Sequence, residues 1–251
     1  MSLLHAVAIF AAGIVAGTIN TVVGSGTLFT FPVLLGFGYA PVVANVSNTI
    51  GLVPGSLSGA IGYRRELTGQ RTRVARLAAA SVSGGIVGAV LLLTLPASAF
   101  KAIVPAFIVI ARVLILAQPR LAILRGGDER TRRRRHAGPL ATLAVFASGI
   151  YGGYFGAAQG ILVLAVLGLS VDDELQRLNA LKVVLTGLVN LVSGIVFVFA
   201  AHVAWAPAGL IAAGSVLGGI IGARAGRRLP GAGLRAVIVL VGVVAIVRLL
   251  A

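Results

Sequence analysis

The sequence contains no cysteine, and it contains very few acidic residues. Without cysteine, the chain can form no disulfide and no thiolate metal site. Aspartate and glutamate number only 6 in 251 residues. All charged residues together make up 11% of the chain, whereas soluble domains carry roughly 25%. Water is therefore not the main solvent around most of this protein.

Apolar residues dominate what remains, at 58% of the chain. They recur in runs of on the order of 20 residues, the length that crosses about 30 Å of hydrocarbon as a helix. We therefore predict an all-α polytopic membrane protein, and we interpret the N-terminal stretch as its first membrane segment rather than a signal peptide, because it lacks a positive n-region. The predicted full spans are 42–62, 77–95, 99–118, 178–201, 207–223 and 232–250.

The net charge of +15 lies almost entirely in loops. By the positive-inside rule the basic loops face the cytoplasm, where they hold the topology and touch anionic lipid rather than nucleic acid. Three clusters are present: Arg64, Arg65, Arg71, Arg73 and Arg76; Arg120, Arg125, Arg130, Arg132, Arg133, Arg134 and Arg135; and Arg224, Arg227, Arg228 and Arg235.

Two further regions, 3–39 and 140–170, each contain a helix, a glycine-rich break and an apolar stretch too short to span comfortably. Each predicts a hairpin that enters and leaves on one side. The basic loops require 140–170 to start and finish inside, and by analogy 3–39 starts and finishes outside. The sequence therefore predicts two inverted-topology repeats, each a re-entrant hairpin plus three helices, at 1–118 and 140–251, joined by a basic cytoplasmic linker at 119–139.

A weak internal duplication agrees with this topology. The stretch AGTINTVVGSGTLFTFPVLLGFG at 16–38 aligns with SGIYGGYFGAAQGILVLAVLGLS at 148–170, and VANVSNTIG at 43–51 aligns with RLNALKVVL at 177–185. The alignment pairs Gly17 with Gly149, Gly24 with Gly156, Asn45 with Asn179, and Asn48 with Lys182.

These same stretches resemble the TauE/SafE sulfite exporter family. The resemblance rests on AGTINTVVGSGTLFTFPVLL, ANVSNTIGLVPGSLSGAIGYRREL, GIYGGYFGAAQGILVLAVLGL and LNALKVVLTGLVNLVSG, and it covers nearly the whole chain. It implies a multi-pass permease of a bacterial inner membrane for small anions, typically sulfite or organosulfonates.

An oxyanion inside a membrane must exchange its hydration for helix N-termini, amides, hydroxyls and cations. The two breaks free backbone N–H groups and begin short helices, so we predict that they form one substrate site. The alternative is that the glycines serve only helix packing, and the amides only helix-to-helix hydrogen bonds. The predicted site residues are Asn20, Gly24, Ser25, Gly26, Asn45, Asn48, Gly156, Gln159, Gly160, Asn179 and Lys182.

Lys182 is the most informative of these residues, because an intramembrane cation is costly and usually functional. It shares a helix face with Asn179 and Thr186. We predict that it is the electrostatic partner of the anion. The competing interpretation is that it snorkels to the cytoplasmic edge and pairs with Asp173 or Glu174.

All six acidic residues lie in predicted loops, so no buried carboxylate is available for a proton relay. An enzyme is not expected, since the chain lacks cysteine, buried acids and an HExxH motif. Neither a cofactor nor a metal is expected. The alternatives left open are an anion channel and an uptake permease for another small oxyanion or carboxylate. The direction of transport, the coupling ion and a homo-oligomeric state also remain open.

Overall fold

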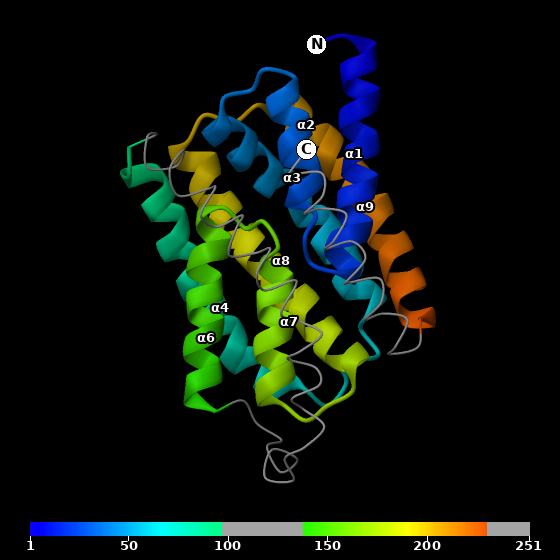
Figure 1. Ribbon diagram of the computed structural model, residues 1–251, viewed down its shortest axis with the longest axis vertical. Coiled ribbons are helices and arrows are strands. Elements are labelled where there is room, and N and C mark those ends of the chain that lie inside the picture. The colour runs from blue at the N-terminus through cyan, green and yellow to red at the C-terminus, as the bar shows by residue number, and fades with distance from the viewer. Residues whose placement is uncertain (97–137, 230–251) are drawn as a thin grey trace.

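The computed structural model describes residues 1–96 and 138–229 (Figure 1). Within these ranges the chain is helical throughout and contains no strand, as predicted. The predicted spans at 99–118 and 232–250, and nearly all of the predicted linker, lie outside the described residues. The eight described helices are α1 (Leu3–Val22), α2 (Thr27–Gly36), α3 (Pro41–Gly62), α4 (Arg71–Thr94), α6 (Pro139–Tyr154), α7 (Gln159–Ser170), α8 (Leu175–Ala200) and α9 (Trp205–Arg228).

The helices predicted at 42–62 and 178–201 are confirmed by α3 and α8. Two other helices extend into the basic loops beyond their predicted ends: α4 begins at Arg71, and α9 ends at Arg228. Arginine is a good helix former, and a cation in the last turn of α9 complements the helix dipole. In the described chain α1, α4, α8 and α9 are long and apolar enough to cross a membrane.

Each predicted break separates a longer helix from a short one. The chain turns between α1 and α2 at Gly24, with φ of +90°, and between α6 and α7 at Gly156, with φ of +73°. Glycine adopts these left-handed conformations without a steric penalty. The short helices α2 and α7 have 10 and 12 residues. Figure 1 shows that the first hairpin opens towards the end of the bundle where the N-terminus lies, and the second towards the opposite end.

The helices pair in a crossed pattern between the two parts of the chain. α1 packs on α9, whereas α6 packs on α4, and α3 and α8 contact each other in the middle. Glycines permit this close approach: a Cβ on Gly17 would overlap the backbone of Ser215, and one on Gly84 would overlap the backbone of Phe146. Close backbone contact at small residues is how helices associate when lipid removes the hydrophobic driving force.

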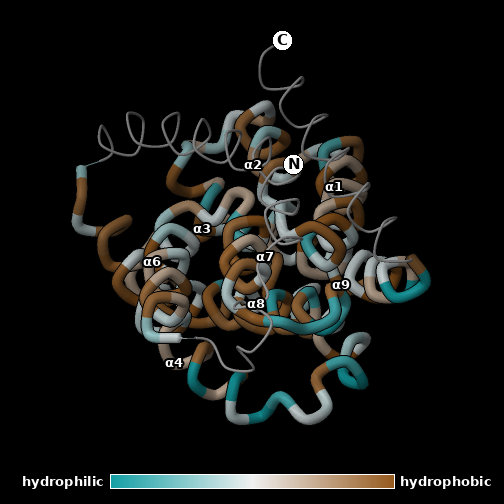
Figure 2. The backbone as a smooth tube through the Cα atoms, turned by 60° about the horizontal axis from the view of Figure 1, so that its bottom comes forward, coloured by the Kyte–Doolittle hydropathy of each residue, from teal (hydrophilic) through white to brown (hydrophobic). Residues whose placement is uncertain are grey.

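The two ends of the bundle differ in polarity. Figure 2 shows apolar helices, with hydrophilic residues gathered in the loops at one end and at the tip of α9. We call this the basic end; it comprises the loop 63–70, the loop 171–174 and the end of α9. The Gln176 side chain joins two of these parts, because its Nε2 donates to the Gly226 carbonyl at 2.7 Å.

Candidate anion site

The two breaks meet in the interior of the bundle. The N–H of Gly160, in the first turn of α7, donates to the carbonyl of Gly24 at 2.9 Å. A Cβ on either glycine would overlap the backbone of the other, and would also approach Cδ of Lys182 within 3.1 and 3.0 Å. Only glycine therefore fits at both positions. The structure brings together the two segments that the sequence predicted to form one site, and we call this contact the crossing.

Lys182 lies beside the crossing with no exposed surface. Its Nζ donates to the carbonyls of Asn20 at 3.0 Å and Thr21 at 3.1 Å, which are at the C-terminal end of α1. A helix end leaves carbonyls without intrahelical partners, and a cation there is favoured by the helix dipole. The snorkelling interpretation is wrong: the ammonium points into the bundle, because the unpaired carbonyls of a broken helix lie there.

The start of α2 presents buried donors that have no partner. Ser25 is 1% exposed, and its hydroxyl makes no hydrogen bond within the described residues. The backbone N–H groups of Gly26 and Thr27 likewise donate to no described atom. Together with the positive end of the α2 dipole, such N–H groups form a favourable environment for an anion.

Asn48 holds the first turn of α2 in place. Its Nδ2 donates to Oγ1 of Thr27 at 3.1 Å, and its Oδ1 accepts from the hydroxyl of Thr30. Sequence reasoning missed both threonines, although two hydroxyls three residues apart directly after a break are a usable signal. Asn20 approaches the same region from α1, and its Nδ2 donates to Oγ of Ser56 at 3.4 Å. These amides therefore surround the unpaired donors.

Asn45 and Asn179 connect the two halves. Nδ2 of Asn45 donates to the carbonyl of Tyr154 at the end of α6, at 3.0 Å. Nδ2 of Asn179 donates to the carbonyl of Thr21 at the end of α1, at 3.4 Å. The two asparagines that the alignment paired thus make equivalent contacts, each with the first hairpin helix of the opposite half. Their Nδ2 groups therefore donate to carbonyls at helix ends. This agrees with the alternative in which the amides serve helix-to-helix hydrogen bonds.

Gln159 and Gly156 shape the second break. Nε2 of Gln159 donates to the carbonyl of Ser148 at 3.1 Å, and a Cβ on Gly152 would overlap the Gln159 side chain. The N–H of Gly156 closes the turn by donating to the carbonyl of Tyr151 at 3.1 Å. These two residues hold α6 and α7 together. The backbone N–H groups of Ala157 and Ala158 between these helices also donate to no described atom, and the first break differs in adding the unpaired Ser25 hydroxyl.

Ser81 and Ser215 form a second matched pair, which the sequence analysis did not predict. Ser215 Oγ donates to the Gly51 carbonyl at 2.8 Å, and Ser81 Oγ donates to the Leu185 carbonyl at 3.2 Å. Positions 51 and 185 are aligned in the internal duplication, with a separation of 185 − 51 = 134, and the serines are separated by the same 215 − 81 = 134. Extending the alignment would have found them.

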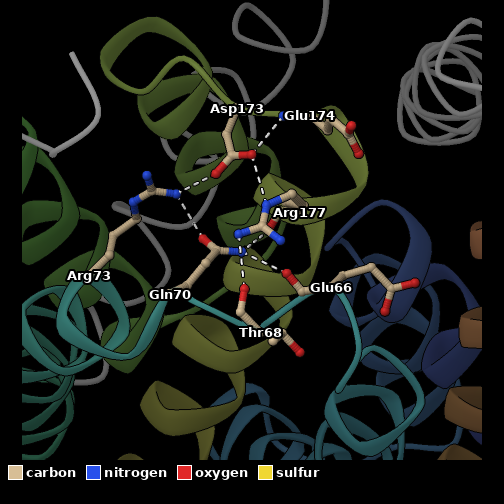
Figure 3. A network of polar contacts seen from close by, with 7 residues as sticks. All are labelled: Glu66, Thr68, Gln70, Arg73, Asp173, Glu174 and Arg177. Carbon is tan, nitrogen blue, oxygen red and sulfur yellow. Dashed lines mark hydrogen bonds and ion pairs between the residues drawn. The ribbon is translucent and has the colours of Figure 1, made fainter. Parts of the chain in front are cut away.

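Asp173 forms a polar network at the basic end (Figure 3). Its carboxylate accepts from Arg73 at 2.7 Å and from Arg177 at 2.8 Å. Burial by itself raises the pKa of Asp173, but the hydrogen bonds from Arg73 and from the Glu174 N–H, together with the charges of both arginines, hold this pKa below its usual value. Nη2 of Arg177 also donates to the carbonyl of Thr68 at 3.1 Å. The network therefore joins the loop before α4 to the start of α8.

Long apolar helices with two broken hairpins meeting inside the bundle define a multi-pass membrane protein. The chain belongs to the family described as Sulfite exporter TauE/SafE, whose sequence profile matches residues 9–249. It is 28% identical over 220 residues to the probable membrane transporter protein YfcA of Escherichia coli strain K12, covering 86% of this chain and 78% of YfcA.

Two further relatives give the same class. A probable membrane transporter protein of Haemophilus influenzae is 26% identical over 216 residues, covering 86% of this chain and 83% of the relative. The probable membrane transporter protein ORF9 of a Sinorhizobium species is 26% identical over 244 residues, covering 97% and 91%. No solved structure matches the chain. The family and these relatives are membrane transporters and not enzymes, so this protein is a membrane transporter.

Proposed function

We propose that this transporter exports a small anion, sulfite or an organosulfonate, across a bacterial inner membrane, and that the anion binds beside the crossing. The observation that carries this proposal is the set of unpaired donors at the start of α2, led by the Ser25 hydroxyl. Lys182 is the one charged side chain among the buried residues of the described ranges, so no carboxylate there neutralises it. Unpaired donors and a cation are what an oxyanion requires in place of water.

The proposed topology places the basic end in the cytoplasm, in keeping with the positive-inside rule. The hairpins then open to opposite faces of the membrane, as expected for inverted repeats at 1–118 and 140–251 joined by a linker at 119–139. Matched contacts support this symmetry, since Asn45 and Asn179 each cap the hairpin helix of the opposite half. In transporters with such repeats, the site lies near the membrane midplane where the halves meet.

The proposed mechanism is alternating access, in which one half rocks against the other around the anion. An anion that leaves a cell with a negative interior gains about 2.3 kcal/mol per charge per 100 mV, so export requires no coupling ion. The backbone contact between Gly24 and Gly160 closes the crossing, which favours alternating access over the anion channel. An uptake permease for another oxyanion or carboxylate would use the same donors, and the direction of net flux distinguishes it.

The test is efflux from proteoliposomes loaded in turn with sulfite, thiosulfate, taurine or chloride. We expect saturable efflux of a sulfur oxyanion or a sulfonate. Ser25→Ala removes a hydroxyl that makes no hydrogen bond in the structure, so it should leave stability unchanged while raising KM about tenfold or more, since a hydrogen bond to a charged group contributes roughly 1.5 to 3 kcal/mol.

Ser83→Ala is the matched control, because Ser83 is exposed and its hydroxyl bonds only to the Ala79 carbonyl of its own helix. Its efflux should equal that of the natural protein. Unchanged KM in Ser25→Ala would rule out the proposed binding site. Absence of saturable efflux for every anion tested would rule out the proposed substrate class.

A further inference from the structure

A pocket of about 410 Å³ lies at the basic end, beside the last turns of α3 and α9. Arg64 and Arg65 line it from the residues that follow α3, and Arg224 and Arg227 line it from the end of α9. An adjoining pocket of about 350 Å³ shares three of these arginines. The pocket is separate from the crossing and from the Asp173 network, and neither uses any of its arginines.

The arginines of this pocket form no ion pair with any described residue. Both ion pairs of the described chain are made at Asp173, by Arg73 and Arg177. The one acidic residue near the pocket is Glu66, in the adjoining cavity, and it forms no ion pair within the described residues. Four guanidinium groups without an ionic partner in the described chain surround one hollow and favour an anionic group there. The planar fork of arginine fits phosphate oxygens in pairs.

The membrane-facing wall of the pocket is apolar. Ile61 is 54% exposed and Ile220 is 36% exposed, and both line the pocket. The same helix faces continue away from the basic end with Leu57, 62% exposed, and Leu217, 46% exposed, at spacings of four and three residues. A small soluble anion would make no use of this apolar strip, whereas an acyl chain would cover it.

The floor of the pocket is closely packed. α3 and α9 touch at their small residues, so that a Cβ on Gly62 would overlap the Ala223 side chain. The Ser58 hydroxyl on α3 donates to the carbonyl of Val216 on α9 at 3.1 Å. A ligand in this hollow would therefore contact one helix from each half of the chain.

We propose that this pocket binds the headgroup of an anionic phospholipid from the leaflet at the basic end. The phosphate lies between the arginines of the two helices, and an acyl chain lies along the strip from Ile61 and Ile220. Anionic headgroups are held in the same manner by basic pockets between membrane helices in general. The site is independent of the transported anion.

The test is native mass spectrometry of the purified full-length protein, titrated with phosphatidylglycerol and with phosphatidylcholine of identical acyl chains. We expect the anionic lipid to bind more tightly. Replacing both Arg224→Gln and Arg227→Gln should weaken phosphatidylglycerol binding roughly 25-fold, at about fivefold for each arginine near an anionic headgroup. The control pair Arg71→Gln and Arg76→Gln removes the same charge outside the pocket and should change binding less than about twofold.

Two further variants and one competitor complete the test. Arg64→Gln with Arg65→Gln removes the charges from the α3 side and must reproduce the loss, which guards against a folding defect in the first pair. Inorganic phosphate at millimolar concentration should not displace the lipid, and Ile220→Gln should weaken lipid binding. Equal losses in the pocket and control pairs, equal binding of the two lipids, or displacement by inorganic phosphate would each overturn the lipid site.

Discussion

The N-terminal half of the described chain, α1 to α4, and the C-terminal half, α6 to α9, make matching contacts at one pair of aligned positions and different contacts at another. Asn45 and Asn179 bind opposite hairpin helices in the same manner. Asn48 and Lys182 do not match. Asn48 stays within its own half and binds α2, whereas Lys182 reaches across to the end of α1 in the other half.

The matched contacts between the halves are neutral, whereas the unmatched position carries a charge. The duplicated contacts hold two copies of one architecture together, and they are made by neutral side chains and backbone carbonyls. The buried positive charge is present once among the described residues, beside the first hairpin, where the unpaired Ser25 hydroxyl also lies. The proposed anion site is therefore asymmetric although the framework around it is paired.

Gly24→Ala should have the largest effect on the framework. The substitution places a Cβ against the Gly160 backbone and requires a left-handed conformation, so we expect a loss of about 2 to 5 kcal/mol of stability. Gly38→Ala is the control, since Gly38 also has a positive φ, of +84°, but no atom within 4 Å. It should cost only about 1 to 2 kcal/mol. Equal shifts in thermal unfolding would show that the crossing contact is unimportant.

Lys182→Asn gives both halves an asparagine at the aligned positions 48 and 182. The shorter side chain leaves the Asn20 carbonyl without a donor, at a cost of about 1 to 3 kcal/mol. The Thr21 carbonyl loses the Lys182 bond and keeps only the 3.4 Å bond from Asn179. We expect lower thermal stability and at least a tenfold loss of sulfite efflux. Lys182→Gln keeps an N–H donor but no charge, so it should regain stability without regaining efflux. Full efflux in Lys182→Gln would contradict a role for the charge.

Asn45→Ala and Asn179→Ala test the matched pair directly. Each removes one hydrogen bond to a helix-end carbonyl of the opposite half, and in Asn179→Ala the Thr21 carbonyl keeps its bond from Lys182. Hydrogen bonds between membrane helices average about 0.6 kcal/mol with a maximum near 1.7, so each variant should lose roughly 1 kcal/mol. Unfolding in a denaturing detergent measures both. A loss confined to one variant would show that the halves are not equivalent at this contact.

Acid should weaken the Asp173 network, and this is the smallest expected effect. The pKa of Asp173 lies below its ordinary value of 3.8, so its contribution is present in full above that value and is lost as the pH falls below it. Partly exposed ion pairs contribute about 0 to 1 kcal/mol. Thermal unfolding of Asp173→Asn should differ from that of the natural protein at neutral pH, and the difference should shrink as the pH falls below 3.8. A constant difference would contradict the assignment.

The helices and breaks could be predicted from sequence. The length of an apolar run predicts a membrane helix, and a glycine-rich stretch predicts a break. The meeting of Gly24 with Gly160 followed from treating the two breaks as one site. The partners of Lys182 could not be predicted in the same way, since they are backbone carbonyls and no side chain identifies them. Asn179 and Gln159 were predicted as site residues, and their amide N–H groups donate to backbone carbonyls, of Thr21 at the end of α1 and of Ser148 within α6. A broken helix exposes carbonyls as well as N–H groups, and those carbonyls compete for every nearby amide.

The cap that Lys182 places on α1 also sets an order for assembly during synthesis. Lys182 follows Asn20 by 162 residues, so at about 5 to 20 residues per second the end of α1 waits on the order of ten seconds for its partner. Unpaired carbonyls cost several kcal/mol in lipid. We therefore expect the end of α1 to be stabilised in the membrane interior once α8 has emerged, and we expect a chain truncated before α8 to expose α1 to quality-control proteases.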